Sequence, residues 1–531
     1  MSRTARRTGG EVGVVAALVL AFLALPAFLA ARAGALWIPH NDSWAHTRIA
    51  TTLAEDGVLE LIGFNRAAMV GMMAPLGPLG SSIVVQHLFV MLCGAAVLGF
   101  SYATARRAHL PLTSSALAAA LVGLAPGFAL LSTSYMTDVP MMAGIAGALH
   151  FGVRFVESGR TGDWALAVLS AAWGVTVREQ ALAALVAVAL VSWLMRRDRR
   201  RLIALGTGAA LVALAVFEIW RRSHAGDDPP HVGLNPSYAV RSMAMALMSL
   251  MFICAPALLA SARRPRRLLT WAAAGLAALM GAVMLVLMGS GMLLGNYLAP
   301  EGAYEGMLHG QRSTVPAPLM WAAALLAAVA LTALATHVRP PHRPRPVSPA
   351  SWEAAPAVLA GFLVLYLGGT FVQSLSGQAM FERYLYPLVV PVVVLVLCGA
   401  HMTAGRWAAA AAAGAVVLSV TSLITAHTWA STGAVWRTAE EIVSQGTDPR
   451  EVDAGFAWVG HHSQTPLAGE DARTEPVDIW AGQFPDSRQC LIVAMGSPVA
   501  DGGEVVEVRS YPKYILGGTD QVVIQRLPQC R

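Results

Sequence analysis

Four ionisable side chains lie where long apolar runs meet short polar loops in this chain of 531 residues. Two are acids, Asp42 and Asp138, and two are arginines, Arg178 and Arg383. A carboxylate can take a proton from an acceptor hydroxyl, and an arginine can hold a phosphate bidentately while negative charge grows on it. Together these residue types predict the displacement of a phosphate leaving group at the edge of a membrane.

Each of the four residues also has a purely structural interpretation. Asp42 opens a helix-like segment and Asp138 stands two residues before a proline, so either acid could cap a helix by accepting free N–H groups. Each arginine is next to a glutamate in the sequence and could pair with it, or with another acid, at a helix end. An ionisable residue at the edge of hydrocarbon is costly unless it is paired or functional. The residues by themselves leave both interpretations open.

The composition places the chain in a membrane. Hydrophobic residues make up 56% of it, charged residues only 13%, and the mean hydropathy is +0.56. A soluble protein would need about a quarter charged residues to cover its surface. A soluble enzyme, a disordered chain and a disulfide scaffold are therefore excluded. The net charge of +6 comes from short arginine clusters between apolar runs, which indicates membrane orientation rather than nucleic-acid binding.

We expect an all-α polytopic membrane protein with about 13 transmembrane helices, because about 20 helical residues cross the hydrocarbon core. The expected spans are residues 12–31, 83–103, 113–131, 140–156, 164–177, 181–195, 202–219, 242–260, 269–288, 317–336, 356–373, 387–400 and 407–426. The spans 164–177 and 181–195 are short and could form one long helix.

The arginine clusters favour two separate spans in that region. With two spans, the clusters at 196–201 and 263–267 are cytoplasmic, as the positive-inside tendency requires. The odd total then puts residues 427–531 on the extracytoplasmic face of a bacterial-type inner membrane. All four ionisable residues described above reach that same face.

Two domains are expected, a transmembrane catalytic domain at 1–426 and a small α/β extracytoplasmic domain at 427–531. In the first, a long loop at 34–82 contains an amphipathic stretch, which predicts an interfacial helix with Trp44 at headgroup level. In the second, the pattern predicts an amphipathic helix at 435–445, followed by β-strands at 455–459, 491–494, 505–508 and 521–525.

Two of the five cysteines, Cys490 and Cys530, lie in the polar tail. They could form a disulfide if the tail faces an oxidising compartment, closing a loop of about 40 residues. They could equally be two unpaired small residues. Five cysteines are too few for a disulfide framework.

Four short motifs, taken in order, resemble the C-type integral-membrane glycosyltransferases. The motifs are Asp42-Ser43-Trp44 with the amphipathic stretch after it, Tyr135-Met136-Thr137-Asp138-Val139-Pro140, Arg178-Glu179-Gln180 and Glu382-Arg383-Tyr384-Leu385-Tyr386-Pro387. The branch they resemble is that of the protein O-mannosyltransferases and aminoarabinose transferases. The resemblance covers the span pattern from about residue 12 to residue 426, and the tail is similar to the small extracytoplasmic domain of some members.

The resemblance implies transfer of a sugar from a polyprenyl-phosphate donor to an acceptor protein, glycan or lipid at the outer face, among membrane lipids and without nucleic acid. Asp42 matches the loop acid that acts as general base, and Asp138 matches a second acid near the donor or acceptor. Arg383, together with Arg178, would hold the lipid phosphate, with Tyr384 beside them. Many protein mannosyltransferases have an Asp-Glu pair where Asp42 is followed here by serine, so sugar transfer in general is better supported than transfer to protein.

No cofactor is firmly implied, although some members of these families use a divalent metal. His40, Asp42, His46 and Asp138 could form such a site, but their spacing does not define a metal geometry. The metal question therefore stays open at this point.

The predicted reaction is a single in-line displacement with inversion at the anomeric carbon. Loops 221–241 and 289–316 are expected to close the acceptor side, with residues 302–310 as a mobile lid. The alternative is a multi-span lipid or glycan transporter or flippase without transferase activity. A transporter would be expected to show broken spans in an inverted repeat, and the sequence shows no convincing repeat.

Overall fold

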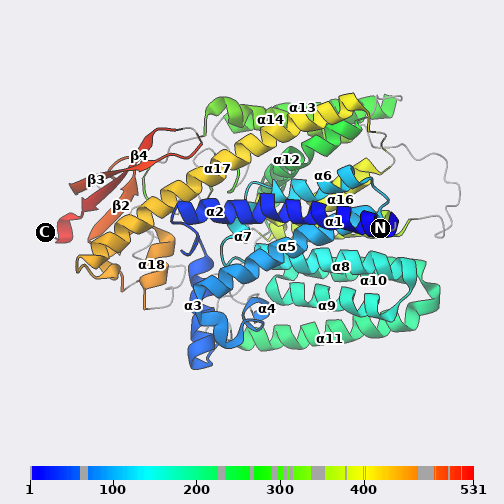
Figure 1. Cartoon of the computed structure of the whole chain (residues 1–531), viewed down its shortest axis with the longest axis horizontal. Coiled ribbons are helices and arrows are strands. Elements are labelled where there is room, and N and C mark those ends of the chain that lie inside the picture. Colours follow the sequence, from blue (N-terminus) through cyan, green and yellow to red (C-terminus); the bar gives the residue numbers. More distant parts are fainter. Residues whose placement is uncertain are drawn as a thin grey trace.

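Long apolar runs fold into helices that lie side by side, and a small sheet packs at one end of this bundle (Figure 1). We call the end that carries the sheet the site end and the other the opposite end. The computed structural model of the chain describes residues 3–59, 70–224, 234–262, 268–289, 296–299, 302–303, 308–310, 315–335, 353–376, 380–398, 400, 402–464, 484, 486–499, 503–515 and 517–530.

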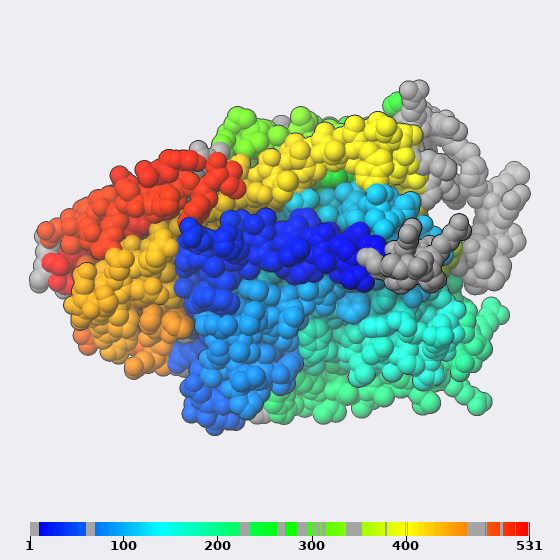
Figure 2. All heavy atoms as spheres, in the orientation of Figure 1, coloured from blue at the N-terminus to red at the C-terminus, as the bar shows by residue number. Residues whose placement is uncertain are grey.

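The chain before the C-terminal region is mostly helical where the structure describes it. Its elements are α1 (Arg3–Val19), the π-helical η1 (Leu20–Ala24), α2 (Leu25–Arg32), α3 (Ser43–Asp56), α4 (Val70–Met73), the 3₁₀ turn η2 (Gly77–Ser81), α5 (Ile83–Arg107), α6 (Leu112–Gly123), α7 (Phe128–Ser132), α8 (Asp138–Ser158), α9 (Thr161–Val177), η3 (Glu179–Ala181), α10 (Leu182–Met195), η4 (Arg197–Arg199), α11 (Arg200–His224), α12 (Pro236–Ser261), α13 (Leu268–Gly289), α14 (Ala317–Ala335), α15 (Ala354–Leu375), η6 (Glu382–Leu388), α16 (Val389–Leu397) and α17 (Ala404–Ser444). Helices α1 and α2 lie exposed across one face of the bundle (Figure 2).

Eight helices in the described part of the chain are long and apolar enough to cross a membrane, the first at Gly10–Arg32 and the last at Ala404–Ser444. Three further apolar helices are shorter: Leu112–Gly123, Glu179–Met195 and Ala274–Val283. This is the architecture of an integral membrane protein. The predicted all-α polytopic fold with a small α/β tail is therefore confirmed, but the predicted total of 13 spans is not.

The region with two candidate spans does contain two helices, α9 and α10. Between them Arg178 adopts an extended backbone, with φ −155° and ψ 137°, and the 3₁₀ turn η3 follows. The expected span 113–131, in contrast, is broken into α6 and α7 around Pro126, because proline cannot continue the backbone hydrogen bonds of a helix. The arginine cluster at 263–267 lies outside the described residues.

Close contact between α8 and α9 brings two of the predicted site residues to one place. A Cβ atom on Gly144 would lie 2.7 Å from the Cα of Gly174, so the two backbones touch where only glycine fits. The helices are antiparallel neighbours in the chain. The first residue of α8, Asp138, is thereby placed beside the residue that ends α9, Arg178.

Helix α3 lies across the long helices at the site end, as expected for the loop at 34–82 (Figure 1). The prediction for Trp44 is wrong, because its side chain is buried instead of lying at headgroup level. The indole packs edge-on against Phe456 and Phe484, with ring centroids 5.8 and 5.4 Å apart, and lies against Gly460. Trp44 therefore fastens α3 to the C-terminal region.

The C-terminal region begins inside a helix. Helix α17 runs for 41 residues and passes the predicted domain boundary at 426/427 without interruption, so the helix expected at 435–445 is its last part. Beyond it lie η7 (Pro449–Glu451), β1 (Val452–Asp453), α18 (Phe456–His462), β2 (Leu491–Met495), β3 (Glu504–Pro512), β4 (Thr519–Arg526) and η9 (Pro528–Cys530). The sheet order is β1-β2-β4-β3, with β1 parallel to β2 and the other pairs antiparallel.

Three of the four predicted strands are present, but the one at 455–459 is wrong. That segment is the start of α18, whose first five residues are all buried. A short run that is apolar on every side has no periodicity that separates a buried strand from a buried helix.

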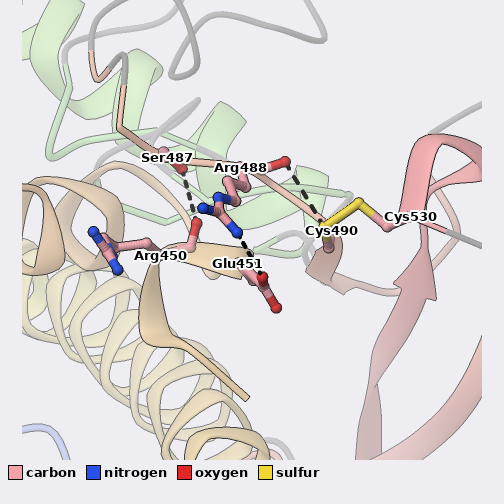
Figure 3. Close-up of a disulfide and its surroundings, with 6 residues drawn as sticks. All are labelled: Arg450, Glu451, Ser487, Arg488, Cys490 and Cys530. Atoms are coloured by element: carbon pink, nitrogen blue, oxygen red, sulfur yellow. Dashed lines mark hydrogen bonds and ion pairs between the residues drawn. A yellow bond between two sulfur atoms is a disulfide. The ribbon is translucent and has the colours of Figure 1, made fainter.

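The structure joins Cys490 and Cys530 in a disulfide where the central strands β2 and β4 begin and end (Figure 3). The Arg488 side chain beside the bridge forms an ion pair of 3.5 Å with Glu451, at the end of η7. The bridge ties the C-terminal residues of the chain to the start of β2. The other three cysteines, Cys93, Cys254 and Cys398, are unpaired.

Candidate functional site

Three charges from distant parts of the sequence meet at the site end, two of them buried and one, Arg178, partly buried. A guanidinium nitrogen of Arg178 lies 2.6 Å from Oδ1 of Asp138, and Nε of Arg383 lies 3.7 Å from the same oxygen. The exposed fractions of the three side chains are 1% for Asp138, 16% for Arg178 and 5% for Arg383. Asp138 is thus a buried carboxylate shared by two arginines.

The capping interpretation of Asp138 does not describe this geometry. Thr137 occupies the N-cap position of α8, and its side chain makes no capping hydrogen bond. The Asp138 carboxylate turns to Arg178 instead. Arg178 does not pair with Glu179, which pairs with Arg221, but it does pair with another acid, Asp138, as the structural interpretation allowed.

Aromatic rings surround both arginines. The Arg178 guanidinium lies 4.6 Å from the centre of the Tyr384 ring. The Arg383 guanidinium lies 5.3 Å from the ring centres of Phe381 and Tyr384 and 5.6 Å from that of Tyr297. Cations are attracted to the faces of such rings, and the rings limit the access of water. Tyr384, expected beside the arginines, therefore lies against both of them.

The local pair expected between Glu382 and Arg383 does not form either. The buried Glu382 carboxylate accepts hydrogen bonds from three consecutive backbone N–H groups, those of Asn296 at 2.8 Å, Tyr297, and Leu298 at 3.2 Å. Burial raises the pKa of Glu382, while the N–H groups act in the other direction. The charge of Arg383 is therefore left for Asp138 and for whatever binds beside it.

Asp42 lies at the start of α3, half-buried, in the N-cap position. Its side chain makes no capping hydrogen bond. Burial would lower the pKa of Arg383, but the negative charges of Asp138 and, more weakly, of Asp42 contribute to raising it well above its usual value. One turn after Asp42, Nδ1 of His46 lies 2.9 Å from the backbone oxygen of Tyr135, in the loop before Asp138. The first turn of α3 therefore lies next to these three charges.

The charges of this cluster do not cancel. Arg178 and Arg383 carry two positive charges and Asp138 one negative charge, which leaves a net charge of +1 before Asp42 is counted. Oδ2 of Asp138 and Nε of Arg383 are buried and make no hydrogen bond. Buried polar atoms that make no hydrogen bond are costly, so these atoms indicate a place where a polar group of a ligand would bind, although Nε of Arg383 also lies within ion-pair distance of Asp138.

The metal site considered for His40, Asp42, His46 and Asp138 does not assemble. His40 and His46 each direct a ring nitrogen at a backbone oxygen, at 2.8 and 2.9 Å respectively. Within the residues that the structure describes, no group of three or more His, Cys, Asp or Glu side chains could hold a metal ion.

An apolar cavity lies inside the bundle next to η6. Tyr386 and Pro387 form one wall, and side chains of α5, α6, α8 and α16 form the others, including Phe100, Val122 and Met142. The Tyr386 hydroxyl accepts a hydrogen bond of 3.2 Å from the backbone N–H of Gly127. The cavity is thus enclosed by spanning helices and by η6, the element that also carries Arg383.

The expected lid at 302–310 is described at residues 302–303 and 308–310. These residues contact the C-terminal region: the N–H of Ala303 donates to Thr428, and the His309 imidazole lies 2.9 Å from the Asp453 carboxylate. Whether the segment moves stays a prediction. Of the loop expected at 221–241, residues 225–233 lie outside the described part.

The roles that Tyr297 and Glu382 have in the site are not predicted by the sequence. Glu382 was expected only as a partner of Arg383, and Tyr297 was one residue of a long loop. The sequence gives no sign that Tyr297 and Glu382 are in contact, because neither segment has a regular hydrophobic period from which its position could be predicted.

Comparison with known proteins supports the family resemblance. Residues 69–220 match the protein family described as dolichyl-phosphate-mannose-protein mannosyltransferase. The matched segment contains Asp138 and Arg178 but neither Asp42 nor Arg383. Over this segment, the predicted similarity to the mannosyltransferase branch of the C-type membrane glycosyltransferases is confirmed.

Two solved structures are similar to the whole chain at low identity. Both are of ArnT from Cupriavidus metallidurans, one bound to undecaprenyl phosphate and one in the apo state. Each is 15% identical, covers 95% of this chain and 98% of its own, and gives a TM-score of 0.36. The comparison with curated proteins gave no match.

Proposed function

We propose that this protein is an inverting glycosyltransferase that moves a sugar from a polyprenyl-phosphate donor to an acceptor hydroxyl at the extracytoplasmic face of the membrane. The single observation that carries the proposal is the cluster in which Arg178 and Arg383 share the one buried carboxylate of Asp138. The family match over residues 69–220 supports the same reaction class. Nothing in that match favours the transport alternative.

The donor phosphate is proposed to bind the two arginines. A phosphate carries negative charge and several acceptor oxygens, and it complements a guanidinium fork better than it complements a point charge. Aromatic neighbours hold both guanidinium groups at the edge of the spanning part, where their interaction with an anion is less screened by water. Asp138 then acts as the fixed counter-charge that holds the arginines in place between turnovers.

The reaction is proposed to be one displacement step. Asp42 takes the proton from the acceptor hydroxyl, and the acceptor oxygen forms a bond to the anomeric carbon. The bond between that carbon and the phosphate oxygen breaks, and its electron pair leaves with the polyprenyl phosphate. The arginines stabilise the departing charge, so no general acid is required. Attack from the side opposite the leaving group inverts the anomeric carbon.

The polyprenyl tail is proposed to stay in the lipid beside the helices. The apolar cavity next to Tyr386 has room for only about one water-sized group, so it cannot take the tail. An apolar tail that stays in lipid is kept out of water without burying polar groups.

The site end is proposed to face the extracytoplasmic side, with residues 427–531 as a domain on that side. The Cys490–Cys530 disulfide lies in this region, and disulfides persist in oxidising compartments. The arginine-rich turn at 196–201 lies between α10 and α11 at the opposite end, which fits the cytoplasmic side of an inner membrane (Figure 1).

The proposal is tested with purified protein in lipid and a panel of radiolabelled polyprenyl-phosphate sugars. Wild type should consume at least one donor, and Asp42→Asn should lower kcat by about 10²- to 10⁴-fold, the usual contribution of a general base. The matched control is Asp56→Asn, at the exposed end of the same helix, which should behave as wild type. Full turnover by Asp42→Asn would remove Asp42 from its role. A wild type that consumes no donor would overturn the function itself.

A further inference from the structure

The Glu382 carboxylate holds a segment that is distant in the sequence. It accepts hydrogen bonds from the backbone N–H groups of three consecutive residues, 296 to 298, which are 84 to 86 positions away. The carboxylate is buried, and its neighbour Arg383 points instead toward Asp138. Three convergent N–H dipoles can neutralise a buried carboxylate much as a helix N-terminus does.

The segment held in this way places Tyr297 against Arg383. The Tyr297 hydroxyl lies 3.3 Å from a guanidinium nitrogen of Arg383, and its ring centre lies 5.6 Å from the guanidinium carbon. On its other side the ring packs on Gly127, where an added Cβ would lie 2.4 Å from a ring carbon. The Tyr297 side chain is fully buried between these two contacts.

We infer that Tyr297 is a further donor-binding residue whose hydroxyl contacts the lipid-linked phosphate next to Arg383, and that Glu382 is the positioning residue that holds it there. The inference rests on the proposed function, because the ligand is the phosphate of the same lipid-linked sugar. A tyrosine hydroxyl can donate to a phosphate oxygen while its ring stays beside the cation.

The test uses the full chain in lipid and three variants, Glu382→Gln, Tyr297→Phe and the double variant. The control is Glu179→Gln, a carboxylate next to Arg178 that is exposed and pairs with Arg221. Two quantities are measured: KM and kcat for the labelled donor, and equilibrium binding of polyprenyl phosphate that carries no sugar. Each single variant should raise KM and the dissociation constant about tenfold, the size of one lost hydrogen bond to a charged group, with kcat changed little.

The double variant separates positioning from general loss of structure. If Glu382 acts through Tyr297, the double variant should be hardly worse than either single variant, whereas independent effects would multiply to about a hundredfold. Multiplying effects would overturn the positioning role. Tyr297→Phe can be prepared even if Glu382→Gln does not fold, and unchanged binding by Tyr297→Phe would overturn the inference by itself. If wild type fails to bind polyprenyl phosphate, it is the proposed function that fails.

Discussion

The charge cluster at the site end of the helix bundle contrasts with the arginine-rich turn at the opposite end. At the site end, Asp138, Arg178 and Arg383 come from three separate segments and meet around one buried carboxylate. At the opposite end, arginines of the turn at 196–201 are numerous and pair with the adjacent Asp198, which is 59% exposed. The pairs within this turn join residues one or two positions apart, at 3.4 Å, although other pairs at the same end, such as Arg107–Glu157, join more distant residues.

This difference shows which property of a charge indicates chemistry in a membrane protein. Exposed local pairs contribute little to stability, and their number reflects membrane orientation. Buried charges that meet from distant segments carry a large desolvation cost, which is retained where the charges bind or react. Convergence and burial, rather than the density of charge, mark the site.

The difference between the two ends is tested most directly by neutralising one acid at each end. Asp138→Asn leaves the two arginines without their counter-charge, so we expect a loss of about 3 to 5 kcal/mol in stability together with loss of transferase turnover. Asp198→Asn at the opposite end should change stability by less than about 0.5 kcal/mol and leave turnover intact. Thermal unfolding in detergent and donor consumption measure both effects. Equal behaviour of the two variants would show that the site end is an ordinary set of ion pairs.

The features that follow from local sequence were predictable. The apolar runs predict the helix positions because hydropathy over about 20 residues decides membrane insertion. The split between α9 and α10 follows from the positive-inside tendency, because a single span there would move the arginine clusters at 196–201 and 263–267 to the outer face. The common side of Asp42, Asp138, Arg178 and Arg383 follows from the same count.

The features that depend on contact between distant segments were not predictable. Trp44 has the pattern of an interfacial residue, but the C-terminal region covers it with Phe456 and Phe484. Likewise Glu382 stands next to an arginine in sequence, yet its oxygens bind a backbone more than 80 residues away. In both cases the partner is supplied by tertiary packing, about which the local pattern carries no information.

The cysteines provide a second comparison, because the C-terminal region contains a disulfide and the opposite end contains an unpaired thiol. The Cys490–Cys530 disulfide lies in the C-terminal region, whereas Cys398 is an unpaired, half-buried thiol at the end of α16 beside Ala108. We expect a membrane-impermeant thiol reagent to label the tail of the protein in intact cells only after reduction. Two tail thiols that react freely without reductant would contradict the disulfide.

Loss of the disulfide should also lower stability. The bridge joins residues separated by 40 positions, and in the chain-entropy model such a loop contributes about 3 to 4 kcal/mol. Cys490→Ser with Cys530→Ser should therefore lower the unfolding temperature, measured in detergent without reductant. Cys398→Ser is the matched control and should have a much smaller effect.

The smallest expected effect is a pH dependence that comes from the His309–Asp453 pair at the site end. Burial would lower the pKa of His309, but the charge of Asp453 and its hydrogen bond raise it above the usual value. A folded-state pKa that is raised stabilises the protein fully below the unfolded value of about 6.5, and the stabilisation is lost as the pH rises through the folded-state value. Wild type should thus lose thermal stability between acidic and alkaline pH relative to His309→Gln. The arginine pairs at the opposite end have no group that titrates in this range, so Arg199→Gln should keep the wild-type pH profile. Identical profiles for wild type and His309→Gln would show that the contact of residues 308–310 with β1 does not depend on the charge of the imidazole.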